Sequence, residues 1–119
     1  MARSRLLECS FLIPTRRDRN LSDGGPHGRI AWTWLEDELA QFGGATRSRA
    51  LYEGWYIDRD TRKRVDDTSQ RFFVAVPAGK VGSLRRLLRR ACGVFRQKCI
   101  YLSVAGVVEF IGGWNREAG

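Results

Sequence analysis

Histidine is almost absent from this chain, because His27 is the only one among 119 residues. A single imidazole excludes the His-hydrophobic-His motif that relaxase and transposase nucleases use. His27 itself lies in the run DGGPHG, just before a segment with helical periodicity. It is therefore a candidate general base or anion contact at a helix N-terminus, or else a capping or solvent-exposed residue. The sequence leaves the role of His27 open.

Cysteine is scarce as well. Cys9, Cys92 and Cys99 are odd in number, lie in apolar segments and have no CxxC spacing. A metal site built on Cys92 and Cys99 would need two further soft ligands, which the chain does not supply. We expect reduced core thiols, no metal site and no cofactor.

Long hydrophobic runs are also missing. Glu8 interrupts the apolar run near the N-terminus, so the apolar centre of a signal peptide does not form. No stretch approaches the roughly 20 apolar residues of a membrane-spanning helix. We therefore expect a cytoplasmic protein without a membrane partner.

The sequence does contain apolar periodicity. Residues 6–13 alternate as a strand does, a helix is expected from Pro26 or Gly28 to residue 41, and strands are expected over 48–58 and 70–77. A second helix follows over 81–97, and residues 99–111 form either one strand or two strands that turn at Ala105 and Gly106.

The element order is thus β-α-β-β-α-β. This order predicts an α+β fold of the ferredoxin-like split βαβ type, in which an antiparallel sheet carries both helices on one face. The expected strand order is last, first, third, second. We expect one domain over residues 1–112 and a frayed tail over 113–119.

The second helix carries the strongest charge pattern, in a chain with 21 Lys and Arg against 13 Asp and Glu. Its apolar face contains Val81, Leu84, Leu88, Ala91, Cys92 and Phe95. Its opposite face, here called the arginine face, contains Arg85, Arg86, Arg89, Arg90 and Arg96. Arginines four residues apart repel each other and have no acidic partner at helical spacing, which favours phosphate as a partner. The main functional prediction is therefore non-catalytic nucleic-acid binding. The alternative is a solvated face balanced by acidic residues of the first helix.

The sheet face away from the helices is the other candidate surface. Strand alternation predicts that it presents Glu8, Ser10, Arg71, Phe73 and Tyr101. The second strand adds either Glu53 and Trp55, or Tyr52 and Tyr56, because its parity is ambiguous. These residues form either a polar-aromatic pocket or a homodimer interface containing a Glu8–Arg71 ion pair.

A pocket on this face would suit the alternative function, a dimeric α/β-barrel-type small-molecule enzyme or ligand-binding protein. Its catalytic residues are unknown from the sequence. A third possibility is a protein-interaction module with Trp34 and Ile30 as an exposed patch.

The runs FGGATRSRALYEGWYID, QRFFVAVP and QKCIYLSVAGVVEFI give the chain its one overall resemblance. Over most of its length it resembles uncharacterised short bacterial proteins. The resemblance implies a bacterial origin and the domain boundaries given above, and it carries no function or site residue.

Overall fold

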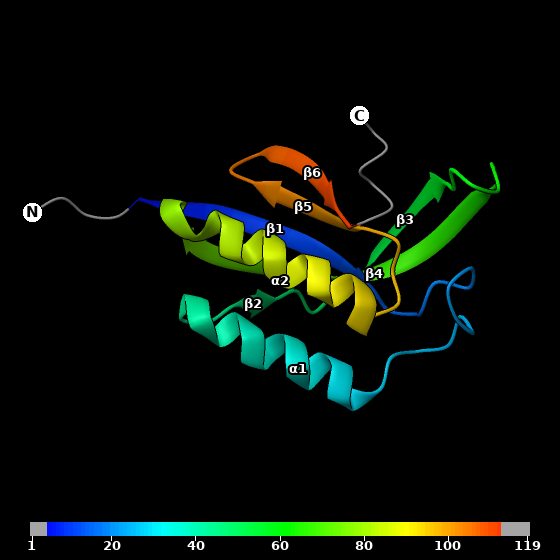
Figure 1. Ribbon diagram of the computed structural model, residues 1–119, viewed down its shortest axis with the longest axis horizontal. Coiled ribbons are helices and arrows are strands. Elements are labelled where there is room, and N and C mark those ends of the chain that lie inside the picture. The colour runs from blue at the N-terminus through cyan, green and yellow to red at the C-terminus, as the bar shows by residue number, and fades with distance from the viewer. Residues whose placement is uncertain (1–4, 113–119) are drawn as a thin grey trace, which may run out of the picture.

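A computed structural model describes residues 5–112 of the chain (Figure 1). Its strands and helices follow in the order β1 (Leu6–Pro14), α1 (Arg29–Leu39), β2 (Thr46–Arg47), β3 (Tyr52–Ile57), β4 (Arg64–Pro77), α2 (Val81–Val94), β5 (Ile100–Val104) and β6 (Val107–Ile111). Short 3₁₀ helices at Ala40–Phe42 and Ala78–Lys80 follow α1 and precede α2.

The described strands form one antiparallel sheet of six strands, ordered β2-β4-β1-β5-β6, with β3 paired to the other half of β4. The predicted α+β class, an antiparallel sheet with two helices, is confirmed. The predicted ferredoxin-like sheet of four strands is not confirmed in its details. The second predicted strand is split into β2 and β3, and β6 extends the sheet beyond β5.

The length of β4 explains the split. The charged stretch 58–67 is typical of a polar turn, yet residues 64–69 belong to β4, which is 14 residues long. Their backbone groups pair with β3 from Tyr52↔Ser69 to Ile57↔Arg64, whereas β1 pairs only with residues 69–77. Beyond Ser69, β3 and β4 therefore continue as a two-stranded ribbon, here called the β3–β4 ribbon.

The C-terminal run forms two strands rather than one. Ala105 and Gly106 turn the chain with φ angles of 49° and 87°. Two consecutive positive φ angles are the geometry of a tight hairpin turn whose twist matches that of the flanking strands. In the resulting β5–β6 hairpin, the paired residues run from Ile100↔Ile111 to Val104↔Val107.

The core lies between the sheet and the two helices, which lie along the same side of β1 (Figure 1). Leu35 and Leu39 of α1 and the apolar face of α2 pack on Phe11 and Phe72, whose rings stack with centroids 5.3 Å apart. The sequence pattern identified this α2 face apart from Leu87, which is also fully buried. Helix α2 ends before its predicted end because Arg96 adopts a left-handed conformation, with φ of 52°.

Within residues 5–112, no helix is long and apolar enough to cross a membrane. The predicted frayed tail, 113–119, lies outside the described residues. The single domain, the cytoplasmic location and the homodimer stay predictions.

Candidate functional site

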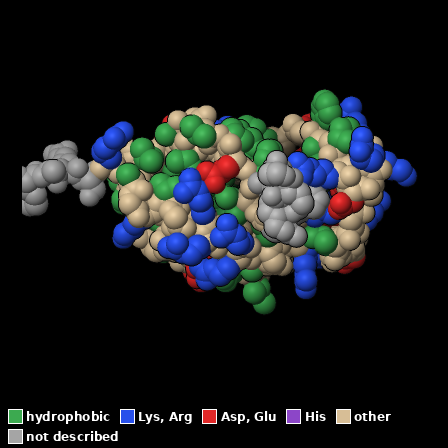
Figure 2. Space-filling view, turned by 45° about the horizontal axis from the view of Figure 1, so that its top comes forward, with side chains coloured by type: hydrophobic (Ala, Val, Ile, Leu, Met, Phe, Trp, Pro, Cys, Tyr) green, Lys and Arg blue, Asp and Glu red, His purple; other side chains and the backbone are tan. Residues whose placement is uncertain are grey.

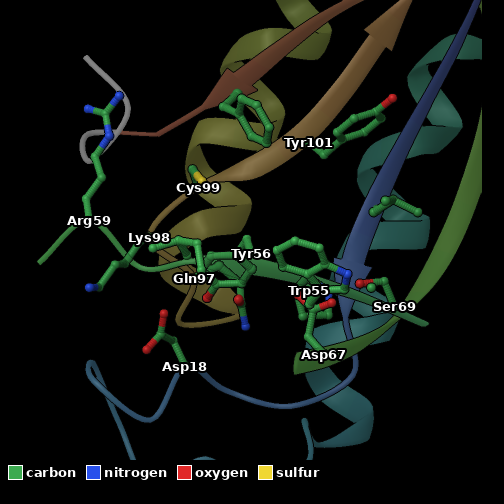
Figure 3. Close-up of a pocket in the computed structure, with 15 residues that line it drawn as sticks. Asp18, Trp55, Tyr56, Arg59, Asp67, Ser69, Gln97, Lys98, Cys99 and Tyr101 are labelled. Atoms are coloured by element: carbon green, nitrogen blue, oxygen red, sulfur yellow. The ribbon is translucent and has the colours of Figure 1, made fainter. Parts of the chain in front are cut away.

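A pocket of about 420 Å³ opens on the sheet face opposite the helices, between the β3–β4 ribbon and the β5–β6 hairpin (Figure 3). Its lining comes from β1, both hairpins, the loop after β1 and the connection between α2 and β5. These residues are Leu12, Pro14, Asp18, Gly54, Trp55, Tyr56, Ile57, Arg59, Asp67, Ser69, Gln97, Lys98, Cys99, Tyr101 and Phe110. A volume of this size is in the range of small-molecule sites.

The register of the ribbon decides which side chains face the pocket. Gly54 lies opposite Asp67, and Tyr56 is two residues further along β3, so Tyr56 and Asp67 share one face. Trp55 and Asp66 lie on the other face, although Trp55, with 60% of its surface exposed, also lines the pocket. Of the two sets left open by the sequence, Tyr52 and Tyr56 therefore join the open face.

Tyr56 is a half-buried phenol of the pocket lining. Burial raises the pKa of its hydroxyl to about 12, and the nearby carboxylates of Asp18, Asp67 and Asp58 raise it further. The phenol therefore stays protonated at neutral pH and is available as a hydrogen-bond donor. Asp18 and Asp67 therefore bring negative charge to this end of the pocket, which the basic side chains of Arg59 and Lys98 also line.

Asp67 supplies a carboxylate inside the pocket. Among the described residues it has no side-chain hydrogen bond or ion pair. Burial, together with the neighbouring Asp66 carboxylate, raises the pKa of Asp67. A half-buried carboxylate without a partner favours a ligand that brings a positive charge or a hydrogen-bond donor.

Aromatic rings face this carboxylate from the other hairpin. Tyr101 of β5 and Phe110 of β6 are cross-strand partners whose rings meet edge to face, with centroids 5.8 Å apart. Figure 3 shows Tyr101 across the cavity from Tyr56 and Asp67. Such rings can stack on a flat ligand or lie against a cation.

The pocket also contains a thiol, Cys99, at the start of β5. Burial raises the pKa of Cys99 to about 11 and that of nearby Cys92 to about 12. At neutral pH both thiols stay protonated, and a protonated thiol is a poor nucleophile. The three cysteines of the chain are free, as predicted from their spacing.

Only part of the predicted open-face set reaches this pocket. Tyr101 lines it, whereas Glu8 and Phe73 line a separate shallow hollow near the start of β1. Between the two, Arg71 Nη2 donates to Ser10 Oγ at 3.1 Å, and its guanidinium lies 4.7 Å from the centre of the Phe73 ring. Arg71 is thus held by Ser10 and by stacking, and the expected Glu8–Arg71 ion pair is not formed.

His27 lies outside the pocket, on the covered side of the sheet. Its Nε2 atom is 2.7 Å from the carbonyl oxygen of Pro14, and its ring meets those of Trp32 and Phe95 edge to face. A carbonyl oxygen only accepts hydrogen bonds, so Nε2 carries the proton. His27 is therefore a packing residue at the edge of the core.

Most arginines of the arginine face have hydrogen-bonding or ion-pair partners within the chain. Arg85 donates to both carboxylate oxygens of Glu109 at 2.8 and 2.9 Å, and Arg90 donates to Glu38 at 2.6 Å. Figure 2 shows acidic side chains beside the basic ones on this side of the molecule. Arg86 donates to Ser83, and Arg96 leaves the helical face because its backbone is left-handed. Arg89 stays exposed.

Comparison with protein-family models and with curated proteins finds no match. Two solved structures do share the fold. One is a phage SAM lyase in complex with S-methyl-5'-thioadenosine, with a TM-score of 0.65, 11% identity, and coverage of 92% of this chain and 88% of that chain. The other is a phage SAM lyase in the apo state, with a TM-score of 0.57, 12% identity, and coverage of 92% and 90%. At such identities the likeness shows the fold.

The prediction of nucleic-acid binding through Arg85, Arg86, Arg89, Arg90 and Arg96 is wrong. The structures that share this fold are lyases named for a small molecule, and they favour the alternative, an enzyme or small-molecule binder. The physical reason lies in the acidic partners. The prediction depended on uncompensated repulsion along α2, and Glu38 and Glu109 provide compensation from other elements.

Sequence reasoning missed most of the pocket, including Asp18, Asp67, Lys98 and Phe110, and it left Tyr56 as one of two alternatives. One signal was present. The alternation of Phe73 and Arg71, extended backwards, places Ser69 and Asp67 on the same open face. The charge of the stretch 58–67 instead indicates a polar turn. The loop after β1 meets the ribbon only in the folded protein, and no pattern in the sequence predicts this contact.

Proposed function

We propose that this protein binds S-adenosylmethionine in the pocket between its two hairpins and cleaves it to S-methyl-5'-thioadenosine. The observation that carries the proposal is the pocket itself: aromatic rings on one side and the unpartnered carboxylate of Asp67 on the other. The structural similarity to the two solved SAM lyases supports this proposal. It also retains the small-molecule alternative derived from the sequence.

The ligand and the pocket have complementary chemistry. S-adenosylmethionine combines a flat adenine with a positively charged sulfonium. Tyr101 and Phe110 offer surfaces for the flat group, and the Asp67 carboxylate offers a negative charge for the sulfonium. A sulfonium near Asp67 would also offset the cost of burying that carboxylate.

The proposed reaction breaks the bond between sulfur and the amino-acid chain. The electron pair stays on sulfur, which becomes the neutral thioether of S-methyl-5'-thioadenosine. A lyase adds no water, so the released carbon either bonds to the substrate's own carboxylate oxygen, forming a lactone, or its neighbour loses a proton, forming an alkene. Asp67 is a pocket carboxylate able to accept that proton, and the neutral Tyr56 hydroxyl can orient the substrate carboxylate.

The test is incubation of the purified protein with S-adenosylmethionine and chromatography of the products. We expect S-methyl-5'-thioadenosine to accumulate in proportion to protein and time. Tyr56→Phe should lower the rate at least about tenfold by removing one positioned hydroxyl. Tyr52→Phe is the matched control, because Tyr52 lies on the same face of the same strand but outside the pocket, near Arg71.

Calorimetric titration with S-methyl-5'-thioadenosine separates binding from turnover. Binding without product would retain the pocket as a ligand site and reject the lyase step. Neither binding nor product, in a protein with a cooperative thermal transition, would reject the proposed function as a whole.

A further inference from the structure

The β3–β4 ribbon has few contacts of its own to hold its outer end in place. Residues 64–68 of β4 pair with β3 alone, because β1 ends opposite Ser69. A two-stranded ribbon is marginally stable in water without further packing. Tyr56 and Asp67 both lie on this part of the ribbon, so the pocket depends on a contact that fixes its end.

That contact is centred on Asp58, directly after β3. Its side chain is fully buried, and its Oδ1 accepts hydrogen bonds from the backbone N–H groups of Asp60 and Thr61 at 2.8 and 3.0 Å. Its Oδ2 accepts from Lys98 Nζ at 2.9 Å and from Asn20 Nδ2 at 3.3 Å. One carboxylate thus orders the turn and connects it to two distant segments.

Lys98 completes the arrangement from the connection between α2 and β5. Its side chain is only 10% exposed, and its ammonium contacts both Asp58 and Asp60, the latter at 2.8 Å. Burial alone would lower the pKa of Lys98, but the hydrogen bonds to the two carboxylates outweigh it and raise that pKa. The pair is therefore ionised and well satisfied, and removing either partner leaves a buried charge.

Each segment that meets at Asp58 also lines the pocket. The turn contributes Arg59, the loop before Asn20 contributes Asp18, and the connection before β5 contributes Lys98 itself with Gln97 and Cys99. Figure 3 shows Lys98, Asp18 and Tyr56 at the same end of the cavity. A change in this pair would therefore move three parts of the pocket lining together.

We propose that Lys98 is the positioning residue of this site, holding Asp58 and thereby fixing Tyr56 at ligand-binding distance. The choice of ligand rests on the proposed function, whereas the positioning of the ribbon does not. Lys98 lines the pocket as well, and the role proposed for it acts through Asp58. A displacement of about 1 Å in a site of this kind can reduce activity by about a hundredfold.

The test compares Lys98→Met with Lys63→Met, since Lys63 is an exposed lysine of the same turn. At a temperature where both variants are folded by circular dichroism, Lys98→Met should weaken binding of S-methyl-5'-thioadenosine about tenfold or more. Lys63→Met should stay within about twofold of wild type. A folded Lys98→Met with wild-type affinity would overturn the proposal.

Two further variants keep the test decisive. The double variant Asp58→Asn/Lys98→Met removes both charges and avoids an unpaired buried carboxylate, so it is used where the single variant does not fold. It should fold and still bind weakly, and wild-type affinity in it would overturn the proposal. Leu88→Ala, a core variant remote from the pocket, should lose stability and keep its affinity. If it lost affinity in parallel with stability, Lys98 would have no role beyond general stability.

Hydrogen exchange tests the positioning without any ligand. Lys98→Met should increase amide exchange over residues 55–62 and leave β1 and α2 protected. If wild type binds no S-methyl-5'-thioadenosine, the proposed function fails and this measurement alone decides the inference. Unchanged exchange over the ribbon would then refute it.

Discussion

The two faces of the sheet use the same alternating strands for different purposes. On the helix-covered face, β1 contributes Cys9, Phe11 and Ile13, and each is fully buried. On the open face, the intervening positions carry Ser10 and Leu12, and neighbouring strands add carboxylates and phenols. Stability is therefore concentrated on one face and binding chemistry on the other, so substitutions on the two faces should have separable effects.

The largest effect is expected on the covered face. Leu88→Ala removes a fully buried side chain of α2 and leaves a cavity, so the free energy of unfolding should fall by about 2–5 kcal/mol. Urea denaturation followed by circular dichroism measures this loss. Ligand affinity, measured on the folded protein, should stay unchanged. A change in affinity of tenfold would show that the two faces are not separable.

Asp67→Asn should have the converse effect on the open face. Loss of the carboxylate should weaken binding of S-adenosylmethionine roughly tenfold or more, since hydrogen bonds and contacts to a charged group are the strong ones. Titration calorimetry measures the affinity. Asp66→Asn is the control, because Asp66 lies on the opposite face of the same strand, in an ion pair with Arg64.

Stability should respond to Asp67→Asn in the opposite direction. The folded protein raises the pKa of Asp67 above 3.8, so ionisation of this group disfavours folding, and the loss develops as pH rises through and above that value. At pH 7, Asp67→Asn should therefore leave the thermal midpoint equal to or above that of wild type. A lower midpoint would indicate that Asp67 is structural.

A smaller effect is expected from His27, at the edge of the covered face. Burial lowers the pKa of His27 below 6.5, with the nearby Arg17 charge acting in the same direction. The neutral form is favoured in the folded state, so stability is complete above pH 6.5 and declines as pH falls below it. Urea unfolding at several pH values measures this decline. His27→Gln should remove it, and an unchanged decline in that variant would assign it to another group.

The smallest effect should come from the surface loop that precedes α1. A bidentate hydrogen bond from Arg17 and the backbone N–H of Gly25 lower the pKa of Asp23 to about 2. This group supports the folded state only above its unfolded pKa of 3.8, and its contribution is lost as pH falls towards 2. Asp23→Asn should therefore match wild type in ligand affinity, as measured by calorimetry. Altered affinity would connect this loop to the pocket.

The residues of the covered face could be predicted well because they recur at regular spacing within single helices and strands. Leu84, Leu88 and Ala91 recur at helical spacing, and Phe11 and Ile13 recur at strand spacing. Each pattern can be read within one element. For residues 99–111 the sequence allowed either one strand or two strands with a turn at Ala105 and Gly106, and the structure has the turn.

The candidate site was less readable because its parts are remote in sequence. Tyr56, Asp18 and Cys99 come together only when the ribbon extends past the end of β1. The charged residues between Asp58 and Asp67 look like a solvated loop until β3 provides their hydrogen-bonding partners. The arginine face led to a wrong prediction for a related reason. Glu109, which binds Arg85, lies 24 residues away along the chain and is not part of the helical pattern.

The ribbon carries two surfaces, and its register selects which one faces the pocket. Gly54↔Asp67 places Tyr56 and Asp67 inwards and leaves Trp55 and Asp66 outwards. Deleting one residue of β3 ahead of Trp55 would turn Tyr56 outwards and Trp55 inwards while Asp67 stays in place on β4, because side chains alternate along a strand. Deleting two would shorten the ribbon and restore the original set. Among homologous sequences, insertions and deletions in this hairpin should therefore occur in even numbers.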